Sequence, residues 1–282
     1  MAVTSAQPGS GAGRSGTVLV TGGTGHLGRD LVKRLVAGGH NVRLLARRPG
    51  SETDVRWVQG DLATGAGIAE ALQGVDTVLN AATLSPIARR GAMRLSDLFS
   101  SPSSVDVDGT RRLLEASARS RVRHFLHVSV VGLDGGGLPY TRLKLAGERL
   151  VRQSPLPWSV VRATPFYYML ANMLAGFRRL PVWPLPNSRW NPVDTTDVAD
   201  YLAECLEDGL RGLREEIRGP EDLSVVEMAR EFQRSRGLRR PILSIPLGTG
   251  MARKMGFVRS EGRRGRKTWS DWLGEHTVQP TP

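Results

Sequence analysis

The fold is decided by the stretch Thr17-Val-Leu-Val-Thr-Gly22-Gly-Thr-Gly25-His-Leu-Gly28. An apolar run at 17–21 leads into the glycines, and residues 27–36 then carry apolar side chains at the spacing of one helix face. Gly22 permits a tight turn, Gly25 lets backbone approach a pyrophosphate, and Gly28 lets the helix pack close to the strand. The stretch predicts a dinucleotide-binding loop, with these cofactor-binding residues: Gly22, Thr24, Gly25, His26, Leu27 and Gly28.

The alternation of strand and helix continues to residue 164. Strands are expected at 41–46, 55–59, 76–80, 124–129 and 158–162, and helices at 67–72, 107–118 and 140–152. This order predicts an α/β fold with a doubly wound parallel sheet of the Rossmann type.

After Thr164 the pattern becomes irregular, with aromatic and proline-rich sequence over 166–192. Further elements are expected at 196–206, 224–236, 242–245 and 269–273. We expect a flexible tail over 1–16, a cofactor-binding core over 17–164, and a small substrate-binding part over 165–282 that is interleaved with the core.

The composition of the 282 residues, 40% hydrophobic and 23% charged, excludes wholesale disorder. The single cysteine, Cys205, can form neither an internal disulfide nor a cysteine-based metal site, and the five histidines lack metal-ligand spacing, so no metal is expected. No run of about 18 apolar residues could cross a bilayer, and 1–16 lacks the apolar centre of a secretory signal. We expect a soluble, cytoplasmic protein without a membrane partner.

The net charge of +12 is concentrated between Arg234 and Lys267, where eleven basic residues face one acid. Such a stretch fits a nucleic-acid groove or a solvated basic face. Only four of the 39 basic residues are lysine, which indicates a general preference for arginine, and no nucleic-acid-binding motif accompanies the charge. We therefore do not expect nucleic acid to be a partner.

The identity of the dinucleotide depends on the end of the second strand, where an acid would bind the adenosine 2′-hydroxyl. Arg47 and Arg48 stand there instead. Although both could be ordinary surface arginines, guanidinium groups pair with a 2′-phosphate and favour NADP(H) over NAD(H). Further cofactor contacts are expected after the third strand and after the fourth, at Asp61, Leu62, Asn80, Ala81 and Ala82.

Tyr140 and Lys144 lie four residues apart in a predicted helix, so both project from one face. An ammonium near a phenol favours the phenolate and lowers its pKa, which lets the tyrosine exchange a proton with a substrate oxygen. A coincidental surface pair is the alternative, but lysine is scarce in this chain. We predict that both residues are catalytic and that Lys144 also holds the nicotinamide ribose.

Together these motifs resemble the short-chain dehydrogenase/reductase superfamily, specifically its atypical NmrA-like, NAD(P)H-binding branch, over residues 17–273. The similarity includes Gln59-Gly60-Asp61, Val107-Asp-Gly-Thr110, Tyr140-Thr-Arg-Leu-Lys144 running into Glu148, Arg162-Ala-Thr-Pro-Phe166 and Val193-Asp-Thr-Thr-Asp-Val-Ala199. The resemblance implies a Rossmann fold with a small C-terminal part, a nicotinamide cofactor, and reduction of small carbonyl, quinone or enone compounds.

One position departs from the family pattern. Catalytically competent relatives have a serine near the end of the fifth strand that hydrogen-bonds the substrate carbonyl. The strand here ends Ser129-Val130-Val131, so either Ser129 or Val130 occupies that position. We include Ser129 among the catalytic candidates.

Aromatic residues after the sixth strand, where such folds place the substrate, are the candidates for substrate binding. They are Phe166, Tyr167, Tyr168 and Trp183. Tyr167 and Tyr168 are adjacent, so at most one can face inward on a helix, and the whole set could equally belong to the core. As ligands they would suit an apolar, polycyclic compound.

The resulting hypothesis is an NADPH-dependent reductase of a small, apolar or aromatic carbonyl, quinone or enone compound. Two alternatives stay open: a non-redox enzyme on the same scaffold (an isomerase, dehydratase or cyclase), and an NADP-sensing regulatory protein without turnover. The sequence does not decide the oligomeric state.

Overall fold

The computed structural model describes residues 16–51, 53–84, 103–133, 139–209, 211–248, 250 and 259–276. All but Gly16 of the expected N-terminal tail lies outside these residues.

The centre of the molecule is a parallel sheet with nine strands among the described residues. The strands follow the spatial order β13-β10-β6-β5-β4-β1-β2-β3, and β9 pairs with β6. Their bounds are β1 (Thr17–Thr21), β2 (Asn41–Ala46), β3 (Arg56–Gln59), β4 (Thr77–Asn80), β5 (His124–Val130), β6 (Trp158–Ala163), β9 (Gly212–Leu213), β10 (Ile217–Arg218) and β13 (Arg263–Arg264). The order of the first six strands is that of the predicted Rossmann fold, which is confirmed.

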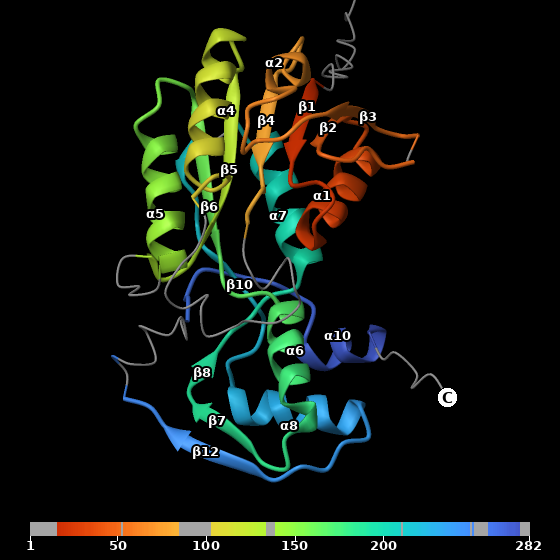
Figure 1. Ribbon diagram of the computed structural model, residues 1–282, viewed down its shortest axis with the longest axis vertical. Helices are drawn as coiled ribbons and strands as arrows, with labels where there is room; N and C mark the ends of the chain where they lie inside the picture. Colours follow the sequence, from red (N-terminus) through yellow and green to blue (C-terminus); the bar gives the residue numbers. More distant parts are fainter. Residues whose placement is uncertain are drawn as a thin grey trace, which may run out of the picture.

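Helices cover both faces of the sheet (Figure 1). One face packs against α1 (His26–Ala37) and α7 (Thr195–Glu207), whose apolar stripes share a core with β1, β2 and β6. The other face packs against α2 (Ile68–Ala71), α4 (Asp108–Arg119) and α5 (Pro139–Arg152). Because the strands are parallel, the residues that follow β1, β4 and β5 reach the same edge of the sheet, as the register Thr21 to Asn80 to His127 shows.

A smaller lobe lies beyond this edge (Figure 1) and has a separate hydrophobic core that includes Trp183 and Trp269. Its elements are α6 (Tyr167–Gly176), η3 (Phe177–Arg179), β7 (Trp183–Asn187), β8 (Arg189–Trp190), β11 (Leu223–Ser224), α8 (Val225–Ser235), β12 (Ile242–Pro246) and α10 (Trp269–Glu275). The expectation of irregular structure over 166–192 is wrong at α6. That helix is apolar around most of its circumference, so its sequence lacks the periodic pattern that would predict a helix.

Within the described parts of the chain, every helix is too short or too polar to cross a membrane.

Candidate active site

The glycine loop joins β1 to α1 at the edge of the sheet that faces the smaller lobe. Gly22 has φ +76°, and a Cβ there would lie 2.7 Å from the Ala82 nitrogen. A Cβ on Gly28 would lie 2.1 Å from the Gly22 oxygen, whereas one on Gly25 would meet only that oxygen, at 3.3 Å. Helix α1 begins without a side-chain cap. Open backbone at Gly25 and uncapped helix N–H groups fit the pyrophosphate of a dinucleotide.

The four residues predicted near the adenosine follow the neighbouring strands β2 and β3. Arg47 and Arg48 come directly after β2 and are both exposed. After β3, the Asp61 carboxylate accepts a hydrogen bond from the Ala63 N–H at 2.9 Å, and Leu62 is buried. The structure therefore brings all four to one end of the cofactor-binding edge.

Asn80 ends β4 and is buried by contacts with neighbouring strands. Its Oδ1 accepts a hydrogen bond from the Thr21 hydroxyl at 2.7 Å, and its Nδ2 lies 3.3 Å from His127 Nδ1. The Asn80 side chain thus ties strand ends together. The half-buried Ala81 and Ala82 are the part of this segment that is accessible to a nicotinamide-side ribose.

The first turns of α5 position the predicted catalytic pair on one face. Tyr140 is half-buried, and Lys144 Nζ lies 6.0 Å from the centre of its ring. The ammonium is buried and lies 3.0 Å from Asp106 Oδ1. That carboxylate also accepts hydrogen bonds from the Thr83 hydroxyl at 2.9 Å and the Leu84 N–H at 3.0 Å. Asp106 therefore joins the segment after β4 to the helix that carries the tyrosine.

The charges of this cluster are set mainly by burial and by the Lys144–Asp106 ion pair. Burial alone would lower the pKa of Lys144, but Asp106 holds it above its ordinary value. Burial alone would raise the pKa of Asp106, but Lys144 and the hydrogen bonds hold it below its ordinary value. For Tyr140, burial raises the pKa and outweighs the opposing effect of Lys144. The expected lowering of the tyrosine pKa is therefore wrong, and the phenol keeps its proton at neutral pH.

Ser129 lies on β5 with its side chain buried toward α5. Its hydroxyl donates a hydrogen bond to Glu148 Oε2 at 2.8 Å. The same carboxylate accepts two hydrogen bonds from Arg162, from Nε at 3.0 Å and from Nη2 at 2.7 Å. A substrate carbonyl would have to compete with this charged acceptor for the serine proton. The contacts favour a positioning role for Ser129.

Ser129→Ala tests that interpretation. We expect the free energy of unfolding to fall by about 1.5–3 kcal/mol, because a buried hydrogen bond to a charged group is lost. Turnover should change less than about tenfold, in contrast to the larger losses that follow removal of a group that transfers a proton. Urea unfolding and steady-state kinetics on the same preparation measure both quantities. A larger loss of turnover with unchanged stability would return Ser129 to the catalytic set.

Two of the predicted substrate-binding residues lie in the core of the smaller lobe. The Tyr167 ring packs against Trp269 and Trp272, and its hydroxyl donates a hydrogen bond to the Lys267 carbonyl at 3.0 Å. Trp183 is fully buried. Both side chains are used in packing, so we remove them from the substrate-binding set.

Tyr168, by contrast, lies across the edge between the two lobes. Its ring stacks on His26 of the glycine loop, with centroids 4.1 Å apart, and on Phe166, with centroids 5.7 Å apart. Burial, followed by the neighbouring Tyr140, raises the pKa of the Tyr168 hydroxyl. His26 is therefore a packing residue, and the stack joins the glycine loop to the start of α6 beside Tyr140.

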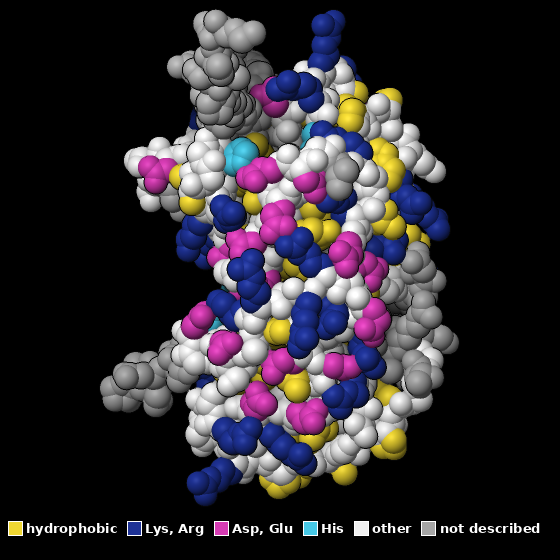
Figure 2. All heavy atoms as spheres, turned by 180° about the vertical axis from the view of Figure 1, so that it is seen from behind, with side chains coloured by type: hydrophobic (Ala, Val, Ile, Leu, Met, Phe, Trp, Pro, Cys, Tyr) yellow, Lys and Arg dark blue, Asp and Glu magenta, His cyan; other side chains and the backbone are white. Residues whose placement is uncertain are grey.

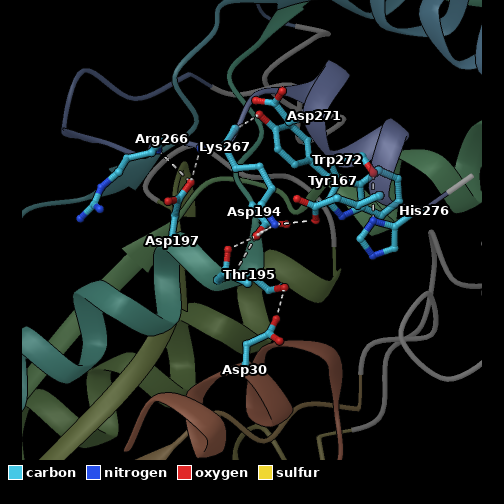
Figure 3. Close-up of polar contacts among 12 residues, drawn as sticks. Asp30, Tyr167, Asp194, Thr195, Asp197, Arg266, Lys267, Asp271, Trp272 and His276 are labelled. Atoms are coloured by element: carbon cyan, nitrogen blue, oxygen red, sulfur yellow. Dashed lines mark hydrogen bonds and ion pairs between the residues drawn. The ribbon is translucent and has the colours of Figure 1, made fainter. Parts of the chain in front are cut away.

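The junction between α7 and the C-terminal segment is shown in Figure 3. Thr195 donates a hydrogen bond to Asp30 of α1 at 2.6 Å, and Lys267 Nζ lies 3.5 Å from Asp194 Oδ1. The Asp197 carboxylate accepts the Lys267 N–H at 3.0 Å. An open hollow of about 650 Å³ lies beside these residues. The Asp197 carboxylate also accepts the backbone N–H of Arg266, and Lys267 pairs with Glu275, so this junction fixes the C-terminal segment on the core.

The basic stretch between Arg234 and Lys267 does not form one uniform face in the described residues. Several of its cations pair with acids from elsewhere in the chain: Arg259 with Asp222, Arg263 with Glu204, and Lys267 with Glu275. Lys254 lies outside the described residues. Paired cations contribute little to the capture of a phosphate backbone.

Two acidic residues of the candidate site, Asp106 and Glu148, make contacts that the sequence motifs did not predict. Asp106 lies between two valines, one residue before the family motif 107–110, and this apolar–acid–apolar pattern is the sequence signal for a buried carboxylate there. Glu148 was part of the quoted pattern, and its spacing of four from Lys144 placed it on the same helix face. Neither signal identifies the partners, which are distant in the sequence: Lys144 on α5 for Asp106, and residues of β5 and β6 for Glu148.

A model of the NAD(P)H-binding family matches residues 22–209 of the 282. The chain therefore belongs to this family, and with its motifs and fold it is an atypical, NmrA-like short-chain dehydrogenase/reductase.

Curated relatives include oxidoreductases and an assembly factor. The chain is 30% identical over 247 residues to (4-alkanoyl-5-oxo-2,5-dihydrofuran-3-yl)methyl phosphate reductase of Streptomyces griseus, covering 84% of this chain and 79% of that protein. It is 27% identical over 304 residues to 3-beta-hydroxysteroid dehydrogenase of Mycolicibacterium neoaurum, covering 93% and 77%. It is also 30% identical over 200 residues to photosystem II assembly factor Ycf39 of Trieres chinensis, covering 68% of this chain and spanning only 60% of that protein.

Solved structures support the fold. MoeE5 in complex with UDP-glucose and NAD matches with a TM-score of 0.71 and 22% identity, covering 93% of this chain and 97% of that one. A short-chain dehydrogenase/reductase superfamily protein of Agrobacterium tumefaciens with bound NAD matches with a TM-score of 0.68 and 21% identity, covering 93% and 96%.

Proposed function

We propose that this protein is an NADP(H)-dependent reductase of a small, apolar or aromatic carbonyl, quinone or enone compound. Tyr140 is the proton donor and Lys144 its tuning partner. The observation that carries the proposal is the buried ion pair between Lys144 and Asp106, whose charged atoms are 3.0 Å apart. Lys144 lies on the face of α5 that also carries Tyr140, whose raised pKa keeps it protonated. If Tyr140 and Lys144 were a coincidental surface pair, Lys144 would be solvated and would not need a buried carboxylate to balance its charge.

Each part of the site has a separate task in this proposal. Reduced nicotinamide, when bound, supplies the hydride. The loop 22–28 holds the pyrophosphate, and Lys144, with donors left after its contact to Asp106, holds the ribose. Tyr140 delivers a proton to the substrate oxygen that gains negative charge, and the adjacent ammonium stabilises the phenolate that remains. The raised pKa of Tyr140 suits a donor in the direction of reduction.

We propose residues 165–282 as the substrate-binding part, with Phe166 and Tyr168 as its contacts. The half-buried aromatic stack beside Tyr140 supports an apolar substrate. The Streptomyces griseus relative is named for a compound that carries alkanoyl and oxo groups, and the Mycolicibacterium relative for a hydroxysteroid. Both names agree with a carbonyl or alcohol on an apolar body.

A panel of aldehydes, ketones, quinones and enones, each incubated with NADPH and the full chain, tests the proposal. Reduction requires NADPH consumption that matches product one for one. Product formed with the cofactor total unchanged would instead establish an isomerase, dehydratase or cyclase. Tight cofactor binding with no turnover across the panel, and no effect of Tyr140→Phe on any cellular substrate, would favour the regulatory alternative.

We also propose that NADP(H) binds more tightly than NAD(H), because exposed Arg47 and Arg48 stand where an acid would select the free ribose. Arg47→Asp should shift the preference toward NAD(H) by about 1–3 kcal/mol, since a charged hydrogen bond is lost and a repulsion is gained. Calorimetric titration of both cofactors measures the shift. Arg119→Asp, an exposed arginine on α4, is the matched control and should leave the preference unchanged. Equal affinities in the unmodified protein would refute the assignment.

A further inference from the structure

The two-stranded ribbon formed by β7 and β12 carries an apolar face on the surface of the smaller lobe. The strands are parallel, and Leu243 pairs with Pro184 while Ile245 pairs with Pro186. Side chains alternate along a strand, so these four share the face opposite the buried Trp183. Leu243 is 58% exposed and Ile245 is 40% exposed.

The chain that enters β7 extends this face. Leu180 and Val182 are each 42% exposed. Among the residues that the structure describes, five large hydrophobic side chains are exposed, and four of them belong to the ribbon or its entry, with Leu213 the exception. Figure 2 shows hydrophobic side chains with basic ones beside them at the lower end of the molecule, where Figure 1 places β7 and β12. Such grouping distinguishes a contact surface from scattered exposed residues.

Arginine pairs precede both strands of the ribbon. Arg178 and Arg179 lie before β7, and Arg239 and Arg240 lie before β12; all four are exposed. Because the strands are parallel, both pairs lie at the end where the chain enters the ribbon. In the described part of the chain, none of the four makes an ion pair. Segments 177–187 and 236–248 contain five arginines and no acid.

We propose that this ribbon is a contact surface for an anionic lipid bilayer. Aliphatic side chains insert at the boundary between headgroups and acyl chains, and arginines beside them bind lipid phosphates while their stems stay apolar. Each cation near an anionic bilayer adds about fivefold to the partition coefficient. The ribbon carries the exposed aliphatic side chains, and its entry end carries the exposed arginines, so both requirements are met side by side.

Other partners fit the ribbon less well. A nucleic acid would use the arginines but gains nothing from exposed leucine and isoleucine. A second copy of this chain would bring two sets of arginines together without an acid in either ribbon to pair with them. This proposal departs from the expectation of no membrane partner, which rested on the lack of an apolar run long enough to span a bilayer.

Vesicle flotation of the full chain tests the proposal. We expect the protein to float with vesicles of phosphatidylcholine and phosphatidylglycerol, to remain unbound with phosphatidylcholine alone, and to be released by salt. Arg239→Gln/Arg240→Gln should lower the partition coefficient about 25-fold, from the loss of two cations. Leu243→Ser/Ile245→Ser should lower it at least about tenfold, because the inserted aliphatic groups are lost.

Matched controls separate the ribbon from general charge and hydrophobicity. Arg111→Gln/Arg119→Gln removes two exposed arginines of α4, and Leu213→Ser removes the exposed leucine of β9. Both should bind vesicles within about twofold of the unmodified protein, whatever the enzymatic activity proves to be. All substituted side chains are exposed, so circular dichroism should report an unchanged Tm.

Three results would overturn the proposal. The first is no flotation of the unmodified protein at low salt. The second is an equal loss of binding in the control variants. The third is a different partner. A dimer in sedimentation that disappears in a ribbon variant would assign the surface to a second copy of the chain. Binding to duplex DNA that is tighter than binding to anionic vesicles, and that disappears in a ribbon variant, would assign it to a phosphate backbone.

Discussion

Tyr140→Phe is expected to lower turnover of the true substrate by about 10²–10⁴-fold while NADPH affinity barely changes. The substitution removes only the hydroxyl, the group that is proposed to deliver the proton. In the proposed site the glycine loop and Lys144 bind the dinucleotide, and both stay in place, whereas Lys144→Ala should lower both turnover and affinity. Steady-state kinetics and calorimetric titration of NADPH measure the two effects separately.

Tyr168→Phe is the matched control, since Tyr168 lies beside Tyr140 and its ring keeps the stack on His26. It should retain most of the turnover. Full activity of Tyr140→Phe would refute the assignment of the proton donor. If Tyr168→Phe were then inactive, the role would move to Tyr168; if it were active, Ser129 or the substrate itself would supply the proton.

Asp106→Asn should lower the free energy of unfolding by about 3–5 kcal/mol, because it leaves the buried Lys144 ammonium without a counter-charge. Asp108→Asn is the matched control. Asp108 lies two residues further along the chain, half-buried, and accepts a hydrogen bond from the Ser103 hydroxyl. Its loss should cost about 1 kcal/mol. Urea unfolding of both variants measures the difference, and equal losses would contradict a special role for Asp106.

The effect of Asp106→Asn should also depend on pH in a defined window. The folded-state pKa of Asp106 lies below its ordinary value of 3.8, so its contribution is present above pH 3.8 and is lost as pH falls through the folded value. The pKa of Lys144 lies above 10.5, so its contribution is present below pH 10.5 and is lost as pH rises through the folded value. The difference in free energy of unfolding between the unmodified protein and Asp106→Asn should be constant between pH 3.8 and pH 10.5 and should shrink outside this range. In the variant, the pH profile of turnover should show an alkaline limb that moves to lower pH.

The Rossmann core could be predicted from the sequence because its signals are local. Residues 17–21 and 26–37 form β1 and α1 almost as the alternation of apolar run, glycines and helix face predicts. Helix α6 could not be predicted in this way, since a segment that is apolar on nearly all sides has no pattern to distinguish it from a loop with many aromatics.

The contacts of the candidate site could be predicted only where both residues lie on one helix or strand, so that their spacing in the sequence places them together. The spacing of Tyr140 and Lys144 on α5 is such a case. Asp106 contacts Lys144 across more than thirty residues of chain, and the sequence does not show whether a lysine charge is neutralised by a neighbour. The direction of the Tyr140 pKa therefore came out opposite to the expectation, because it depends on burial and on that distant carboxylate.

The stack of His26 on Tyr168 would place the proposed cofactor and substrate sites in one equilibrium. His26 lies in the loop that is proposed to hold the dinucleotide, and Tyr168 lies at the start of α6, where the substrate is proposed to bind. A ligand that changes the position of either ring changes the free energy of the other site. By thermodynamic reciprocity, the factor by which the cofactor alters substrate affinity equals the factor by which the substrate alters cofactor affinity. With both sites as proposed, a dissociation constant for either ligand would be defined only together with the occupancy of the other.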